Sequence, residues 1–438
     1  MMKRILIFCT TLFLTLLSNA QQPNIVFILA DDLGYGDLSC YGATDLYTPN
    51  IDKLCEKGIK FTRAYANSTV CSPSRAAILT GNYPDMVGVP GVIRDMPDNT
   101  WGNLSDEAVF LPKQLKALGY HTALVGKWHL GYESPDLPND RGFDHFKGYV
   151  GDMMDDYYTH KRAGINWMRE GSQQINPKGH ATDVFTNWAV EYIKMQSKPD
   201  KPYFLFLTYN APHDPVQPPA DWLDKVKHRE PMASLKRQKL IALIEHLDAG
   251  VGKVMEVIEK SGEADNTLIV FTSDNGGALQ YGANNGLLKG GKGDLYEGGI
   301  RIPCVVRWSG KIKPDTVTQA IMLMDFYPTL VELAGGKYQQ KHSSLSIGNL
   351  LKGESFNSEN REMVFMRREG HRYGGRAYYA ISNGEYKLMQ NSPFEPYQLI
   401  RIIDTSSVEI PVENAIIKKE LWKKLMKHIQ NSGHMPWM

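Results

Sequence analysis

The feature that most constrains the fold of this chain is an alternation, from Asn24 onward, of short apolar segments with longer amphipathic ones. Strands that are separated by helix-length connections pair in parallel, because a long crossover is needed to return to the same edge of a sheet. The pattern therefore predicts an α/β fold, with a large and mostly parallel sheet between two layers of helices. The predicted strands are NIVFILA (24–30), HTALVGKWH (121–129), YFLFLTY (203–209), TLIVFTSD (267–274) and CVVRW (304–308).

The amphipathic stretches between these strands have the spacing of helices that bury one face. They lie at 111–119, 182–196, about 233–260 and 325–335. Gly119 and Gly335 stand where a helix C-terminus favours a residue of positive φ, and we expect both to end their helices in that way.

The character of the chain changes after about residue 340, where Ser, Gly, Asn and Glu become frequent. Strand-like segments at 363–369, 377–390 and 397–404 follow without helix-length connections, which predicts an antiparallel sheet with a hairpin turn at Gly384. A closing helix is expected over 413–430. We therefore predict a catalytic-type domain over 21–345 and a smaller α+β domain over 346–438, with the boundary near 345–362.

The first twenty residues have the pattern of a cleaved secretory signal. Lys3 and Arg4 precede an apolar run that finishes in Ser18, Asn19 and Ala20. The run is shorter than the ~20 residues that a membrane-spanning helix needs, and no second run follows. We expect an exported, soluble chain that starts near Gln21, and a periplasmic location.

The mature chain has no bulk property that suggests a polyanion partner. Without Lys3 and Arg4 its net charge is near −1, against +1 for the whole sequence, so no nucleic-acid partner is expected. Its cysteines Cys40, Cys55, Cys71 and Cys304 are too few for a disulfide scaffold, and all but Cys71 are assigned to packing.

Polar side chains follow the predicted strands, at the edge of the sheet where α/β proteins bind ligands. They are Asp31, Asp32, Lys127, His129, His213, Asp274 and Asn275. Acidic and amide groups after a strand are often only helix caps and turn residues. Three carboxylates on one edge nevertheless repel one another unless a cation is present, and oxygen ligands suit Ca²⁺ or Mg²⁺ better than zinc.

The segment NSTVCSPSRAAILTG (67–81) is the most specific in the chain. Ser72 is expected to cap a helix that has Pro73 in its first turn and ends at Gly81. Cys71 then lies at a helix N-terminus, which favours an anion. A cysteine there is either a small buried hydrophobe or a thiolate of low pKa, and the spacing does not choose between them.

Cys71-Ser72-Pro73-Ser74-Arg75 followed by AAILTG resembles the C-x-P-S-R signature of the sulfatase family, in the alkaline-phosphatase-like superfamily. Five further segments match that family in order: ILADDLGYGDL (28–38), GKWHLG (126–131), APHDP (211–215), SDNGG (273–277) and GKGDLYEGGIRIP (291–303). The resemblance covers residues 24–335. The C-terminal part matches only in general character.

The resemblance implies a catalytic set. A maturing enzyme would oxidise Cys71 to formylglycine, whose hydrate attacks sulfur to give a sulfated enzyme and then expels sulfate. Ca²⁺, or Mg²⁺, would be held by Asp31, Asp32, Asp274, Asn275 and the diol at position 71. Arg75 and Lys127 would stabilise the diol, Lys127 and Lys292 would contact sulfate, His129 would assist the elimination and His213 would protonate the leaving oxygen.

The resemblance and the signal pattern together imply a sulfated sugar or glycan as substrate, which loops around the site would contact. The candidate contacts are Arg94, Asp152, Asp155, Tyr157, His180, His371, Arg372 and Arg376. The cluster at 371–376 is equally well explained as a solvated loop. Glu297 and Arg301 are expected to form a structural pair. Two other functions remain open: a phosphodiesterase or phosphonate monoester hydrolase of the same superfamily, and a binding protein without turnover. The sequence gives no indication of oligomeric state.

Overall fold

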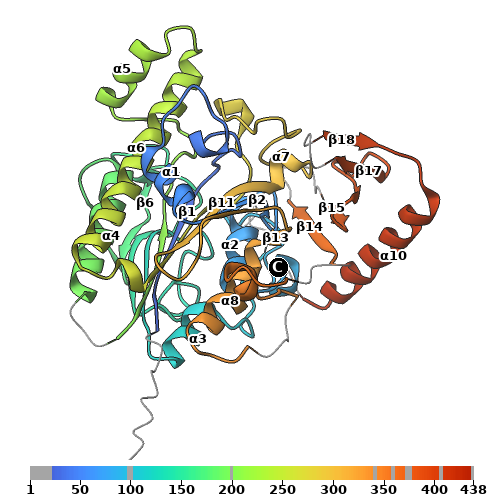
Figure 1. Ribbon diagram of the computed structural model, residues 1–438, viewed down its shortest axis with the longest axis horizontal. Coiled ribbons are helices and arrows are strands. Elements are labelled where there is room, and N and C mark those ends of the chain that lie inside the picture. Colours follow the sequence, from blue (N-terminus) through green and yellow to red (C-terminus); the bar gives the residue numbers. More distant parts are fainter. Residues whose placement is uncertain are drawn as a thin grey trace, which may run out of the picture.

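The computed structural model describes residues 22–95, 102–197, 201–338, 343–356, 361–369, 377–403 and 408–435. Its largest element is a mixed sheet between layers of helices (Figure 1). The strand order is β12-β2-β11-β10-β1-β9-β3-β4-β7-β8, and β13 also pairs with β2. The strands are β1 (Asn24–Ala30), β2 (Ile59–Tyr65), β3 (His121–Lys127), β4 (His145–Tyr149), β7 (Met168–Glu170), β8 (Gln173–Gln174), β9 (Tyr203–Thr208), β10 (Thr267–Ser273), β11 (Arg301–Trp308), β12 (Asp315–Val317) and β13 (Ile321–Met322).

The centre of this sheet is parallel, as predicted. The pairs β10-β1, β1-β9, β9-β3 and β3-β4 all run in the same direction. The predicted strand at 304–308 is part of β11, which runs antiparallel to both β10 and β2. Strand direction at this edge is set by the tertiary path of the chain, which the local pattern of residues does not encode.

Helices cover both faces of the sheet, and the side chains of β1 show why. Ile25, Phe27 and Leu29 belong to a core shared with α2, α3 and α8, while the alternate residues of β1 belong to a core shared with α1, α4 and α6 (Figure 1). Since side chains of a strand point alternately to opposite faces, an unbroken apolar strand needs cover on both.

The predicted helices are present with small shifts of their ends. The helices of this domain are α1 (Pro49–Glu56), α2 (Cys71–Thr80), α3 (Leu111–Ala117), α4 (Ala181–Gln196), α5 (Ala220–Arg229), α6 (Leu235–Lys260), α7 (Glu297–Ile300), α8 (Phe326–Leu333) and α9 (Gly348–Leu351). Gly119 and Gly335 have φ values of 93° and 83°, so both turns are left-handed, as expected.

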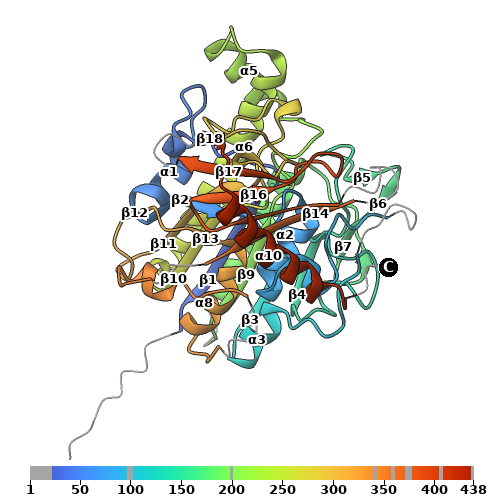
Figure 2. The same cartoon turned by 90° about the vertical axis from the view of Figure 1, so that its right-hand side faces the viewer.

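The C-terminal part forms the predicted antiparallel sheet, in the order β14-β15-β16-β17-β18. Its strands are β14 (Met363–Arg368), β15 (Ala377–Ser382), β16 (Tyr386–Met389), β17 (Gln398–Ile403) and β18 (Val408–Pro411). Gly384 has a φ of 94° in the β15-β16 hairpin. The closing helix α10 (Ala415–Ser432) crosses this sheet (Figure 2).

The two sheets share a core, so the smaller one is anchored to the larger domain. Phe365, Ile381 and Leu425 of the C-terminal part pack in one cluster with Tyr65 and Leu295. Ile347, Leu350 and Leu351, beyond the expected end of the first domain at residue 345, still pack in the core of the large sheet. Among the described residues, no helix combines the length and the apolar character that crossing a membrane requires.

Candidate active site

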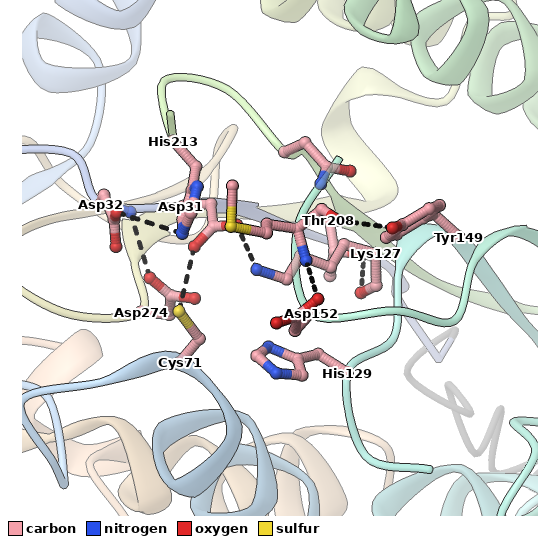
Figure 3. Close-up of polar contacts among 12 residues, drawn as sticks. Asp31, Asp32, Cys71, Lys127, His129, Tyr149, Asp152, Thr208, His213 and Asp274 are labelled. Carbon is pink, nitrogen blue, oxygen red and sulfur yellow. Dashed lines mark hydrogen bonds and ion pairs between the residues drawn. The ribbon is translucent and has the colours of Figure 1, made fainter. Parts of the chain in front are cut away.

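Neighbouring strands of the large sheet bring the predicted polar residues together (Figure 3). Asp31 and Asp32 follow β1, and Asp274 and Asn275 follow its neighbour β10. Backbone bonds keep these ends in register, since the Asp274 N–H donates to the Ala30 carbonyl at 3.2 Å. On the other side of β1, strand β9 leads to His213, and β3 ends at Lys127 just before His129.

Cys71 is the first residue of α2, so the expected helix N-terminus is present at this position. The expectation that Ser72 caps the helix is wrong: the N-cap is Val70, and no side chain caps it. Ser72 Oγ instead accepts a hydrogen bond from the Ile93 N–H at 3.1 Å. It therefore ties the first turn of α2 to the loop that leads to Arg94. The helix ends at Gly81 with a φ of 67°, as predicted.

Three buried carboxylates alternate with three cations. Arg75 donates to Asp274 Oδ2 through Nε at 3.0 Å and through Nη2 at 2.8 Å. Lys127 Nζ lies 2.5 Å from Asp31 Oδ2, and Lys292 Nζ lies 2.7 Å from Asp32 Oδ2. Such charges are stable in the interior only when each has partners of opposite sign.

The three carboxylates still repel one another. Burial and the negative charge of Asp31 raise the pKa of Asp274 to about 7, against the opposing effect of Arg75. Burial also acts on Asp31, but there the charges of Lys127, His213 and Arg75 prevail and lower the pKa. A cation placed between the carboxylates would relieve the repulsion that raises the pKa of Asp274.

Donor atoms at this point meet the needs of such a cation. Oxygen or sulfur atoms of Asp31, Asp32 and Cys71 and a nitrogen of His213 all lie within 4.8 Å of one another. Asn275 Oδ1 is buried and has no hydrogen-bond partner, while its Nδ2 donates to Asp32 Oδ1 at 2.9 Å. An orphaned amide oxygen beside carboxylates is a ligand of the kind that Ca²⁺ and Mg²⁺ prefer.

The Cys71 thiol is held in its protonated form. Its Sγ lies 3.4 Å from Asp31 Oδ1, and the residue is buried. Burial and the charge of Asp31 raise the pKa of Cys71 well above its usual value. The interpretation of Cys71 as a thiolate of low pKa therefore has no support in the geometry of this site.

Two histidines face Cys71 from opposite walls of a pocket. His129 Nε2 donates to the Ile93 carbonyl at 2.9 Å, and its Nδ1 is buried without a partner. Burial, together with the charges of Lys127 and Arg75, lowers the pKa of His129 well below its usual value, so its Nδ1 carries no proton. His129 and Asp32 both have positive φ, at 61° and 67°, a strained conformation that clusters at functional sites.

On the opposite wall, His213 Nδ1 lies 2.7 Å from the Asp214 carbonyl, to which it must donate. Its Nε2 lies 2.9 Å from Lys292 Nζ. Although burial opposes it, the negative charge of Asp32 raises the pKa of Lys292 well above its usual value. Lys292 therefore carries a proton that it shares with His213 Nε2.

The loop that carries Lys292 is held by the C-terminal sheet. The Gly293 carbonyl accepts from Arg367 Nη1 at 3.2 Å. Asn391 Oδ1 accepts from the Leu295 N–H at 2.6 Å. The buried Lys387 contacts Glu297 Oε1 at 2.9 Å, and Glu297 also pairs with Arg301, as expected, at 3.8 Å. The smaller domain thus fixes one edge of the site.

These groups line a pocket of about 230 Å³. Its walls are Val70, Cys71, Val92, Arg94, His129, Asp152, Met153, Arg162, His213, Asp214, Gln280, Tyr281, Lys292, Arg367 and Glu369. Arg94 and Asp152, both predicted as substrate contacts, are among them. His371, Arg372 and Arg376 lie outside the described residues.

Three other predicted contacts do not line the pocket. The Tyr157 hydroxyl donates to the carbonyls of Asn210 and His213, each at 2.9 Å. His180 caps α4 through Nδ1, and its Nε2 lies 3.0 Å from the Gln217 carbonyl. Asp155 accepts from Arg162 Nη1 at 2.7 Å, so it acts on the pocket through that arginine.

The clearest pocket residues that the sequence did not indicate are Arg367 and Glu369, at the end of β14. Glu369 is buried and accepts from Arg94 Nη1 at 3.0 Å and from Arg367 Nε at 3.3 Å. The charged RRE sequence at the end of an otherwise apolar strand was the available signal. It was missed because it lies far in sequence from every recognised motif.

Comparison with known proteins agrees with this geometry. A family model described as Sulfatase matches residues 23–336. The chain belongs to the sulfatase family. A second model, described as N-sulphoglucosamine sulphohydrolase, C-terminal, matches residues 291–432. The similarity of this sulfatase to known proteins therefore extends beyond the part that the motifs covered.

Relatives of this sulfatase include N-acetylgalactosamine-6-sulfatase of Canis lupus familiaris, 33% identical over 72% of the chain and 63% of the relative. A protein named Sulfatase of Formosa agariphila is 33% identical over 79% of the chain and 75% of the relative. The chain thus spans less than two thirds of the length of the dog enzyme. The crystal structure of Ps i-CgsB in complex with k-i-k-neocarrahexaose has a TM-score of 0.86 and 30% identity, with 95% of each chain covered.

Proposed function

We propose that this sulfatase hydrolyses sulfate monoesters of carbohydrates, using a formylglycine made from Cys71 and a bound Ca²⁺. The observation that carries the proposal is the position of Cys71. It begins α2, faces Asp31 at 3.4 Å and lines one pocket with His129, His213 and Lys292. A thiol whose pKa is raised by burial is a poor nucleophile, so a modified side chain explains the site better than a free cysteine.

Asp31, Asp32, Asp274 and Asn275, with residue 71, would hold the cation. The buried and unpartnered Asn275 Oδ1 supports this set, and so does the repulsion that raises the pKa of Asp274 to about 7. Oxygen ligands favour Ca²⁺, with Mg²⁺ as the alternative. The ion would lower the pKa of the attacking hydroxyl and neutralise charge on the sulfate oxygens.

A hydrated formylglycine supplies two hydroxyl groups on one carbon, one to displace the alcohol from sulfur and one to expel sulfate afterwards. Arg75 and Lys127 orient this side chain, because Arg75 donates to both Asp274 and the Lys127 carbonyl and so fixes the floor of the site. His129 Nδ1 is the free base that takes the proton of the second hydroxyl.

The leaving sugar oxygen must be protonated as its bond to sulfur breaks. His213 and Lys292 lie together on the wall opposite His129, where Lys292 Nζ is 2.9 Å from His213 Nε2 and the two nitrogens share a proton. Lys292 also offers positive charge to the sulfate oxygens. His213 is therefore the proposed acid, with Lys292 as the group that supplies its proton.

The outer part of the pocket supports a sugar as substrate. Arg94, Arg162 and Arg367 alternate with Asp152 and Glu369, so donors and acceptors face the same space. Paired guanidinium and carboxylate groups suit the hydroxyls and anionic substituents of a sulfated sugar. The names of the relatives point the same way, since one is an N-acetylgalactosamine-6-sulfatase and one neighbour holds a neocarrahexaose.

We further propose that the chain is exported to the periplasm, where the mature protein starts near Gln21, and that a maturing enzyme oxidises Cys71. The signal pattern of residues 1–20, outside the described residues, supports export.

The experiment is a screen of defined sulfated mono- and disaccharides with matured protein, in which sulfate release is measured. A Cys71→Ala variant serves as control. We expect release from at least one sulfated sugar by the wild type and none by the variant. Turnover of phosphate diesters or phosphonate esters with no sulfate release from any sugar would contradict the proposal.

A further inference from the structure

A pair of cysteine thiols lies outside the pocket, at the junction of η1 (Ser39–Tyr41) and α1. Cys40 Sγ and Cys55 Sγ are 2.8 Å apart. This separation lies between the about 2.0 Å of a disulfide bond and the roughly 3.5 Å or more at which non-bonded heavy atoms pack. We propose that Cys40 and Cys55 form a disulfide bond when the protein matures under oxidising conditions.

The backbone around the pair is already fixed in position. The Cys40 N–H donates to Asp52 Oδ1 at 3.0 Å, and Thr48 Oγ1 donates to the same oxygen at 3.1 Å. The Ser39 N–H donates to Thr48 Oγ1 at 3.0 Å. These bonds join η1 to the first turn of α1, so closing the sulfurs to bonding distance needs a shift of about 0.8 Å.

The other two mature cysteines are not placed to compete. Cys71 Sγ contacts Asp31 in the active site. Cys304 is buried on β11, where the Tyr41 hydroxyl donates to its carbonyl at 2.8 Å. Cys40 and Cys55 are both only half-buried, so an oxidant can reach them.

The step is a two-electron oxidation. The thiols of Cys40 and Cys55 lose two protons and two electrons as the S–S bond forms. The electrons reduce the disulfide of an exchange partner, such as a thiol oxidoreductase or oxidised glutathione, to two thiols. The new bond closes a loop over residues 41–54 and restricts the unfolded chain.

The pairing has a consequence for Cys71 that rests on the proposed function. An exported chain carries Cys71 and three other thiols into an oxidising compartment, and a wrong pairing with Cys71 would block its conversion to formylglycine. If Cys55 pairs with Cys40, the two more exposed thiols are no longer available to react, and Cys71 stays unpaired.

The test uses the full mature protein, purified without reductant and equilibrated with oxidised glutathione at neutral pH. Free thiols are alkylated in denaturant, and the digest is analysed by mass spectrometry without reduction. We expect one cross-linked pair of peptides that contains Cys40 and Cys55, is lighter by two hydrogen atoms and disappears after treatment with dithiothreitol. Alkylation of both residues, or a link from Cys55 to Cys304, would overturn the proposal.

A thermal comparison measures what the bond contributes. Dithiothreitol should lower the Tm of the wild type and of Cys304→Ser by a few degrees, and leave the Tm of Cys40→Ser and Cys55→Ser unchanged. The peptide result does not depend on turnover, so failure of the disulfide and failure of the sulfatase activity are separate outcomes. Equal Tm values for the wild type with and without reductant would contradict the stabilising role.

Discussion

Lys292 Nζ lies 2.9 Å from His213 Nε2, and the same ammonium lies 2.7 Å from Asp32 Oδ2. Because His213 Nδ1 donates to the Asp214 carbonyl, Nε2 is the acceptor in this contact. The proton on the pocket side thus belongs to Lys292 before substrate binds. His213 can act as an acid only by passing on the proton of Lys292. The acid is therefore coupled to a residue that also contacts Asp32 of the metal set.

The first prediction concerns His213→Ala. A sugar alkoxide must be protonated to leave, whereas a nitrophenolate leaves unaided, so the variant should lose about 10²- to 10⁴-fold in kcat/KM on a sugar sulfate and much less on a nitrophenyl sulfate. The measurement is kcat/KM for both substrates, with the modification of residue 71 verified in each protein. His228→Ala, at an exposed histidine of α5, is the matched control and should resemble the wild type.

Equal losses on both substrates would show that His213 positions sulfate or the metal set instead. The acid would then be Lys292. In that case Lys292→Ala would lose more kcat/KM on the sugar sulfate than on the nitrophenyl sulfate.

The second prediction concerns the cation. Treatment with a chelator should abolish turnover, and added Ca²⁺ should restore it and raise the Tm of the chelated protein. Asn275→Ala removes the orphaned oxygen and should weaken this Ca²⁺-dependent rise in Tm, because one ligand is lost. Asn187→Ala, at an exposed position of α4, should behave as the wild type. A Tm that does not respond to Ca²⁺ or Mg²⁺ would count against this metal set.

The third prediction concerns the contact between the C-terminal sheet and the Lys292 loop. Asn391→Ala removes the acceptor of the Leu295 N–H and a donor to Asp294, which lies 3.2 Å away. We expect kcat on a sugar sulfate to fall by about 10- to 100-fold, because a small displacement of Lys292 spoils the geometry of proton transfer.

The readout that distinguishes positioning from general destabilisation is the dependence on the leaving group. Asn391→Ala should impair the sugar sulfate more than the nitrophenyl sulfate, with little change in KM. Asn383→Ala, which removes the turn contacts of the β15-β16 hairpin, is the control in the same sheet and should leave kcat unchanged. An identical effect of the two variants would contradict a positioning role.

Much of the site followed from the sequence because it lies at strand ends. The apolar segment that ends at Asp31 and Asp32 predicts both a strand and the polar residues at its end. The parallel pairing of β1 with β10 then brings Asp274 beside these residues. The order of strands and their direction are tertiary properties, so the antiparallel placement of β11 left no local signal.

The outer pocket was less predictable for a related reason. Tyr157 and His180 come from loops near the site, but they bond to backbone carbonyls and do not line the pocket. Glu369 and Arg367 reach the pocket from the second domain. They lie too far in sequence from the recognised motifs for any of these motifs to indicate them. Ser72 was expected to cap α2, but the N-cap lies two residues earlier, at Val70, and the Ser72 hydroxyl accepts from the Ile93 N–H instead.

The proposed function rests on a modified Cys71 that performs sulfate ester hydrolysis on sugars. The most direct measurement is mass spectrometry of the peptide that contains residue 71, made on preparations of different specific activity toward one sulfated sugar. We expect kcat to rise in proportion to the fraction of formylglycine and to be zero for Cys71→Ala. Full turnover by a preparation that contains only unmodified cysteine at position 71 would contradict the proposed function.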